Sequence, residues 1–182
     1  MRRLLLLRHA KTERDSPSGL DRDRRLDARG REDAPVIGTY MREHKLVPYL
    51  ALVSPATRTR ETFELLTPTL ETELEADFIG DLYGADAREV LQIVHAASGR
   101  ADDADLKSIL VIGHNPGLHE LSLQLISKAK PEDREELNEN LPTSGLVVLK
   151  FAVENWTDIA VRHGTLERFV SPRRLRLQRE GD

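Results

Sequence analysis

The chain has 182 residues, with 27 Lys and Arg against 31 Asp and Glu, and no cysteine. This length suffices for one domain with a buried core, and a sequence without cysteine excludes disulfide frameworks, thiolate zinc sites and cysteine nucleophiles. Charge is unevenly distributed: residues 1–31 carry ten Lys and Arg against five acidic residues, whereas residues 61–105 carry two against twelve. A basic first segment is compatible with a solvated surface and with binding of an anion.

Five short apolar segments are predicted as strands. Residues 3–8, 50–53 and 109–113 are continuous aliphatic runs, typical of parallel strands buried on both faces. Residues 145–151 and 157–162 are predicted as two later strands. No apolar run is long enough for a signal peptide core or a membrane span, so we expect a soluble, cytoplasmic protein with no membrane partner.

Helices are predicted between the strands. Residues 30–45 carry an apolar stripe with Asp27 as a possible N-cap, and Ser54 and Pro55 are predicted to cap and begin the next helix. Three further helical segments are predicted. One follows a capping box at residues 86–89, and a second begins at Pro116. Residues 130–140 are predicted as a short exposed helix or loop.

This alternation of strands and helices predicts a single α/β domain over residues 1–182 with a mostly parallel sheet. Ligands of such sheets bind beyond the carboxyl ends of the strands. Arg8 and His9 follow the first predicted strand, Arg58 lies in the first turn of a helix after the second, and His114 follows a third. Each alone is compatible with a structural role, but together they are suited to surround one tetrahedral anion.

The Arg8-His9 pair, the SPxxR segment that ends at Arg58 and the GHNP segment at His114 resemble the histidine phosphatase superfamily, which is related to phosphoglycerate mutases. The resemblance covers roughly residues 1–151. Ala10 and Lys11 after the RH pair, together with the short length, are most similar to the SixA-type phosphohistidine phosphatases. The resemblance implies a three-layer α/β/α sandwich of the phosphoglycerate mutase type with a minimal cap.

The resemblance also implies roles for these residues. His9 attacks phosphorus as a neutral imidazole and becomes transiently phosphorylated, with its other ring nitrogen held by a hydrogen bond. Arg8, Arg58 and His114 bind the three equatorial oxygens of the phosphoryl group. With these four groups neither a metal nor another cofactor is needed.

The general acid is the least defined part of the predicted site. The superfamily places a carboxylate before a Tyr-Gly element, which makes Asp81 the first candidate and Asp77 the second. A phosphohistidine substrate loses imidazole, a better leaving group than an alkoxide, so a dedicated acid is not essential. Lys11 and Thr143 are candidates for additional substrate contacts, although a solvated loop and a turn explain them equally well.

The chain length bears on the substrate. Only 55 residues separate Arg58 from His114, and two helices and a strand occupy much of that segment, which leaves little for a lid. An open site suits a phosphohistidine presented by a signalling or phosphotransfer protein. A small-molecule phosphomonoesterase is the alternative enzyme, and a catalytically silent module that binds phosphate or phosphoproteins is the alternative outside catalysis.

Two other classes are disfavoured. His114 and His119 are five residues apart across Pro116, which does not match the i, i+4 spacing of helical zinc ligands. Nucleic-acid binding depends only on the arginines near the end of the chain, while the net charge is −4 and aromatic residues make up 4%. Those arginines are Arg173, Arg174, Arg176 and Arg179.

Overall fold

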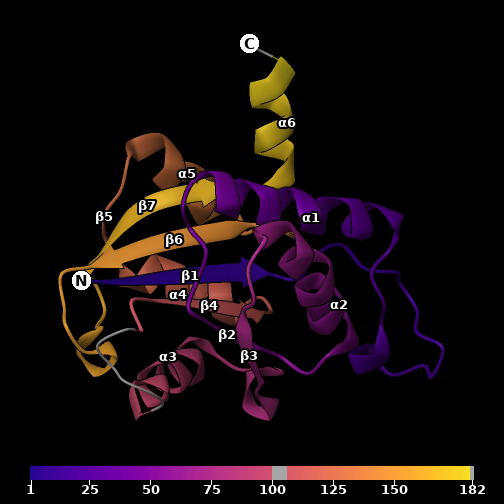
Figure 1. Cartoon of the computed structure of the whole chain (residues 1–182), viewed down its shortest axis with the longest axis horizontal. Helices are drawn as coiled ribbons and strands as arrows, with labels where there is room; N and C mark the ends of the chain where they lie inside the picture. Colours follow the sequence, from indigo (N-terminus) through magenta and orange to yellow (C-terminus); the bar gives the residue numbers. More distant parts are fainter. Residues whose placement is uncertain (100–105, 181–182) are drawn as a thin grey trace.

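Within residues 1–99 and 106–180, seven strands form one sheet at the centre of the molecule (Figure 1). These are the residues that the computed structural model of the protein describes. The strands are β1 (Arg2–Arg8), β2 (Leu50–Val53), β3 (Glu75–Phe78), β4 (Ser108–Gly113), β5 (Ile126–Lys128), β6 (Leu146–Phe151) and β7 (Gly164–Val170). Their order in the sheet is β3-β2-β4-β1-β6-β7-β5.

The sheet is mostly parallel, as predicted. β3, β2, β4 and β1 run parallel to one another, and β7 runs parallel to β5. β6 is antiparallel to both β1 and β7, with Leu146 opposite Leu7. Because of this reversal, the start of β6 lies at the same edge of the sheet as the carboxyl ends of β1, β2 and β4.

Helices cover both faces of the sheet (Figure 1), which confirms the predicted three-layer architecture. The helices are α1 (Ala28–Glu43), α2 (Thr57–Leu66), α3 (Ala87–Ala96), α4 (Gly117–Leu125), α5 (Pro131–Glu139) and α6 (Pro172–Glu180). Leu4 and Leu6 of β1 pack with α3, α4 and α5, whereas Leu5 and Leu7 pack with α1, α2 and α6. All four leucines are fully buried, as expected of a central strand whose side chains alternate between the two faces.

Two predicted caps are confirmed and one is wrong. The side chain of Asp27 accepts a hydrogen bond from the backbone of Gly30 at the start of α1, and Asp86 with Glu89 forms the predicted capping box of α3. Ser54, however, does not cap α2, because the helix begins only at Thr57. Its hydroxyl is used in the site described below.

The strand predicted over residues 157–162 is also wrong. The segment starts within a 3₁₀ turn, η5 (Trp156–Asp158), and the strand β7 begins only at Gly164. The indole of Trp156 is buried and donates to the carbonyl of Leu106, and this tertiary contact anchors the turn. The edge strands β3 and β5 were not predicted, since β3 is partly polar and exposed and β5 has only three residues.

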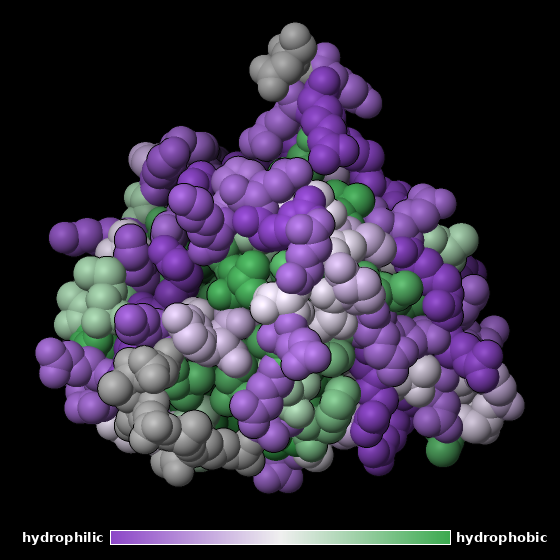
Figure 2. Space-filling model, viewed as in Figure 1, coloured by the Kyte–Doolittle hydropathy of each residue, from purple (hydrophilic) through white to green (hydrophobic). Residues whose placement is uncertain are grey.

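Hydrophilic side chains cover most of the face seen in Figure 2, including α6, which projects from the body of the molecule. In the part of the chain that the structure describes, no helix combines the length and the apolar character needed to cross a bilayer.

Candidate active site

The site lies where three parallel strands end side by side. His9 follows β1, Ser54 follows β2 and His114 follows β4, and these strands are neighbours in the sheet. The backbone N–H of His9 donates to the carbonyl of Gly113 (3.1 Å), and that of Ser54 donates to the carbonyl of Ile112 (3.0 Å). The sheet therefore holds the two histidines close together, although 104 residues separate them in the sequence.

His9 is held in one tautomer. Its Nδ1 lies 2.8 Å from the carbonyl oxygen of Ala10, and because a carbonyl only accepts, Nδ1 carries the proton and Nε2 keeps a free electron pair. This is the hydrogen bond expected on the second ring nitrogen. Burial lowers the pKa of His9 to about 3; the Ala10 carbonyl acts in the opposite direction, and the nearby cationic groups lower it further. The imidazole is therefore neutral at physiological pH.

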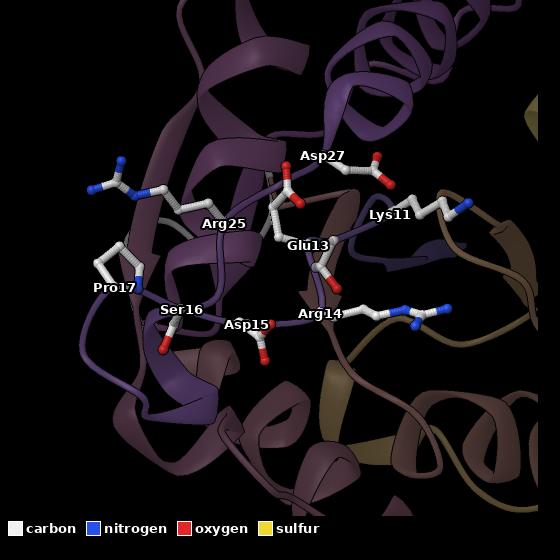
Figure 3. A pocket seen from close by; sticks show the side chains of 9 residues that line it. Lys11, Glu13, Arg14, Asp15, Ser16, Pro17, Arg25 and Asp27 are labelled. Carbon is white, nitrogen blue, oxygen red and sulfur yellow. The ribbon is translucent and has the colours of Figure 1, made fainter.

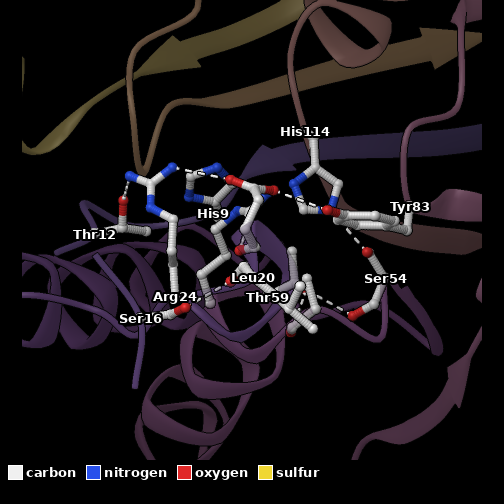
Figure 4. Close-up of polar contacts among 12 residues, drawn as sticks. His9, Thr12, Ser16, Leu20, Arg24, Ser54, Thr59, Tyr83 and His114 are labelled. Carbon is white, nitrogen blue, oxygen red and sulfur yellow. Dashed lines mark hydrogen bonds and ion pairs between the residues drawn. The ribbon is translucent and has the colours of Figure 1, made fainter. Parts of the chain in front are cut away.

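His114 lies next to His9, with a distance of 5.4 Å between ring centroids. Its Nε2 is 2.7 Å from the hydroxyl oxygen of Ser54 (Figure 4). Burial, and then the charge of Arg58, lowers the pKa of His114 to about 4, with a smaller opposing effect from Asp21. A hydroxyl that donates to Nε2 leaves the ring proton on Nδ1, where it is available to an anion.

Two arginines complete the cationic pocket. Nη1 of Arg8 donates to the carbonyl of Leu141 (3.0 Å), in the loop that the reversed strand β6 brings to this edge. Arg58 is buried, with 7% of its surface exposed, although it carries a full positive charge at physiological pH. The charges of both arginines lower the pKa of His9, which indicates that all three groups share one environment.

Unpaired polar atoms are concentrated at this pocket. In the described part of the chain, the buried side-chain nitrogen and oxygen atoms without a hydrogen-bond partner are Arg8 Nε, His114 Nδ1, Asn115 Oδ1 and Ser144 Oγ. Two of them belong to the predicted site residues, and the other two belong to residues adjacent to His114 or in the loop before β6. Because buried polar atoms are nearly always paired, this group indicates a place for a polar ligand.

Two residues of the pocket were missed by sequence reasoning. Asp21 lies in the 3₁₀ turn η1 (Asp21–Asp23), and its carboxylate accepts from Arg58 Nη2 (3.0 Å) and from the hydroxyl of Tyr83 (2.8 Å). The ring of Tyr83 stands edge-on to His114 at 5.6 Å. The Tyr83 position could have been found from the Tyr-Gly element, but nothing local distinguishes Asp21 from the other acidic residues of its loop.

The remaining candidates line other depressions or lie in an edge strand. Asp81 lines an open depression of about 510 Å³ beside Tyr83, and Asp77 lies in the edge strand β3, paired with Leu52. Lys11 lines a depression of about 770 Å³ formed by the loop after β1, with its charged end on the same side as that of Arg14 (Figure 3). Lys11 and Thr143 together line another of about 540 Å³. Asp81, Lys11 and Thr143 therefore stay predictions.

The arrangement is suited to phosphoryl transfer. A neutral imidazole with a free electron pair lies in a pocket with two guanidinium groups and a second neutral imidazole. Such a pocket binds a tetrahedral oxyanion and stabilises the charge that spreads over its oxygens during transfer.

Comparison with known proteins agrees with this chemistry. The model of the histidine phosphatase superfamily (branch 1) matches residues 4–79. An uncharacterised protein of Mycobacterium tuberculosis is 33% identical over 92% of this chain and all of its own length. An uncharacterised chloroplastic protein of Arabidopsis thaliana is 34% identical over 68% of this chain, which spans only 59% of the plant protein.

Among solved structures, a candidate SixA phosphohistidine phosphatase of Agrobacterium tumefaciens superposes with a TM-score of 0.75. The match has 27% sequence identity and covers 94% of this chain and 98% of that one. One assignment follows from the matching family model, from the M. tuberculosis relative matched over its full length, and from the histidines and arginines that meet in one pocket. The chain belongs to the histidine phosphatase superfamily.

Proposed function

We propose that this phosphatase removes the phosphoryl group from a phosphohistidine carried by a signalling or phosphotransfer protein, with His9 as the nucleophile. The observation that carries the proposal is the state of His9. The carbonyl of Ala10 holds the proton on Nδ1, so Nε2 is able to attack phosphorus without first losing a proton.

The other groups of the pocket bind and polarise the phosphoryl group. Arg8 Nε is buried and unpartnered within the described residues, and Arg58 retains donors beyond the two that it gives to Asp21. Together with His114 they supply the positive charge and the hydrogen bonds that stabilise the equatorial oxygens in the transition state. Phosphoryl transfer depends mainly on such positioning and charge stabilisation.

The open rim supports a protein as the source of the phosphoryl group. Tyr83 is 38% exposed and the Asp21 side chain 54% exposed, so the mouth of the pocket faces solvent. A side chain presented by another protein can enter there, whereas a small metabolite would leave much of its surface in water. The phosphohistidine phosphatase name of the A. tumefaciens structure supports the same substrate class.

The experiment measures turnover of a histidine-phosphorylated protein and of p-nitrophenyl phosphate, together with trapping of an acid-labile phosphoenzyme. We expect turnover of the phosphohistidine protein and a labelled intermediate, both lost in His9→Ala with a rate decrease of at least about 10³-fold. His44→Ala is the matched control, because His44 is exposed and contacts Tyr40, away from the pocket.

The outcomes separate the alternatives. Turnover of p-nitrophenyl phosphate without action on phosphohistidine would contradict the proposed substrate and favour a small-molecule phosphomonoesterase. Binding of phosphate with no turnover and no trapped intermediate would contradict an enzyme altogether and leave a binding module.

A further inference from the structure

Asp21 brings a carboxylate with an open acceptor position to the mouth of the pocket. Its Oδ2 accepts from the hydroxyl of Tyr83 (2.8 Å) and from Arg58 Nη2 (3.0 Å), and its Oδ1 accepts from Arg24 Nη1 (3.1 Å). A carboxylate has about four acceptor positions, so these contacts within the described residues leave one position on Oδ1. With 54% of the side chain exposed, that position is accessible to a substrate.

This carboxylate does not act as an acid. The hydrogen bond from Tyr83, and those from Arg24 and Arg58, lower the pKa of Asp21 to about 2, although its partial burial acts in the opposite direction. The group is therefore ionised at neutral pH and has no proton to donate to a leaving group. Its chemistry there is that of a hydrogen-bond acceptor with a negative charge.

The relative exposure of His9 and Asp21 bears on the direction in which a leaving group would depart. His9 is 8% exposed and lies on the inner side of the pocket, whereas Asp21 lies at its mouth. The attacking and leaving atoms in phosphoryl transfer are roughly in line. A group displaced from phosphorus by His9 therefore points outward, toward the rim that Asp21 and Tyr83 form.

We propose that Asp21 determines the leaving-group specificity of this site. Its carboxylate accepts a hydrogen bond from the free ring N–H of a phosphorylated imidazole, and it thereby selects phosphohistidine over phosphate esters. This inference rests on the proposed function and assigns the residue that makes the substrate choice.

Charge is the physical basis of the choice. A phosphoimidazole protonated on its second nitrogen has a cationic ring next to its anionic phosphoryl group, which matches a pocket with arginines inside and a carboxylate at the rim. A phosphate ester has the anionic part alone, so the carboxylate repels it and gains no hydrogen bond in return. Specificity of this kind needs both the attraction to one ligand and the repulsion of the other.

The reaction has two steps, transfer of the phosphoryl group to His9 and its hydrolysis, and protons and electron pairs balance in both without a separate acid. In the first, the electron pair of His9 Nε2 forms the bond to phosphorus while the bond to the substrate nitrogen breaks, and its electron pair stays on the leaving ring. The second nitrogen of that ring already carries the proton held by Asp21, so a neutral imidazole leaves.

In the second step, water attacks the phosphorus of phosphorylated His9. The P–N bond breaks and its electron pair returns to Nε2, while Nδ1–H remains bound to the Ala10 carbonyl. Water keeps its protons in the product, which departs as dihydrogen phosphate. The Ala10 carbonyl thus holds the ring proton of His9, as Asp21 holds the ring proton of the substrate imidazole.

The test compares wild type, Asp21→Asn and the control Asp23→Asn with two substrates, a phosphohistidine peptide and p-nitrophenyl phosphate. Asp23 lies in the same turn, but its carboxylate accepts from Ser18. In Asp21→Asn we expect kcat/KM for the peptide to fall about 10- to 100-fold, as for loss of one hydrogen bond to a charged group. Turnover of the ester is expected to stay within about threefold or to rise, and Asp23→Asn to match wild type.

Inhibition by vanadate supplies a readout that a merely structural role would not produce. Removal of the rim charge is expected to leave vanadate binding unchanged or tighter in Asp21→Asn, whereas loss of support for Arg58 would weaken it. Equal decreases for both substrates, with weaker vanadate binding, would overturn the inference. The proposed function fails separately, if wild type itself does not act on phosphohistidine.

Discussion

His9 and His114 have neutral imidazoles for the same physical reason. Both rings are buried next to Arg8 and Arg58, and a protonated imidazole in that position would be poorly solvated and repelled by the arginines. A neutral His9 is able to act as a nucleophile across the physiological pH range. The positive charge that remains in the pocket is that of the two arginines, which suits it to an anionic ligand.

The first prediction concerns the protonation of these rings. In the free protein, the imidazole carbon resonances of His9 and His114 are expected to stay constant between pH 8 and pH 5, because their pKa values are lowered to about 3 and about 4. A histidine-labelled sample observed by NMR checks this. A midpoint near the ordinary value of 6.5 for either ring would show that burial does not control its charge.

The second prediction concerns Ser54, whose hydroxyl holds Nε2 of His114. Ser54→Ala removes this hydrogen bond and lets the ring adopt either tautomer, so kcat is expected to fall about tenfold, equivalent to about 1.4 kcal/mol. Steady-state kinetics with p-nitrophenyl phosphate measure the change. An unchanged kcat would mean that His114 is oriented without Ser54.

At the scale of elements, the position of α4 depends on a close approach between backbones. Its first residue, Gly117, lies against the turn after η3 (Gly80–Leu82), and a Cβ at this position would overlap with the carbonyl oxygen of Ala85. The neighbouring turn carries Tyr83, whose ring contacts His114. Because Gly117 has no side chain, helix α4 can pack closely against the turn that carries Tyr83.

The third prediction follows from this contact. Gly117→Ala forces the turn and the helix apart, so we expect a loss of about 1–3 kcal/mol in the free energy of unfolding and a decrease in activity. Gly80→Ala is the control, because a Cβ there meets no atom within 4 Å. Urea denaturation of both variants tests the difference, and equal stability would contradict the close approach.

For the whole molecule, the two buried histidines make stability depend on pH. Between about pH 6.5 and the folded pKa values of about 3 and 4, the unfolded chain binds protons at His9 and His114 that the folded chain does not bind. Protonation therefore favours unfolding, and this contribution to stability is complete above pH 6.5 and is lost as the pH falls. The lowered pKa of Asp21 also stabilises the fold, and this contribution is lost as the pH falls from the ordinary pKa of 3.8 to the folded value of about 2.

The fourth prediction is that the free energy of unfolding decreases from pH 7 to pH 4, with each histidine contributing up to about 1.4 kcal/mol per pH unit. Denaturation curves at a series of pH values measure the slope. His9→Gln is expected to have a shallower slope than wild type over this range, because it removes one of the two groups. Equal slopes for His9→Gln and wild type would contradict the lowered pKa of His9.

Local sequence patterns were sufficient to predict much of the fold. Continuous aliphatic runs identified β1, β2 and β4, and the carboxyl ends of these strands located His9 and His114, because a parallel strand buried on both faces leaves a clear signal. The edge strands lacked this signal. At η5, the burial of Trp156 prevailed over the strand propensity of the residues that follow.

The RH, SPxxR and GHNP segments could be recognised without the fold as the signature of the family and as candidate site residues, since the adjacent strand or helix places each of them. Which carboxylate reaches the pocket, in contrast, depends on contacts between segments that are distant in the chain. Asp21 meets Arg58 across 37 residues and Tyr83 across 62, and no local periodicity encodes such contacts. The composition of the loop shows several acidic side chains, and the packing of η1 against α2 selects one of them.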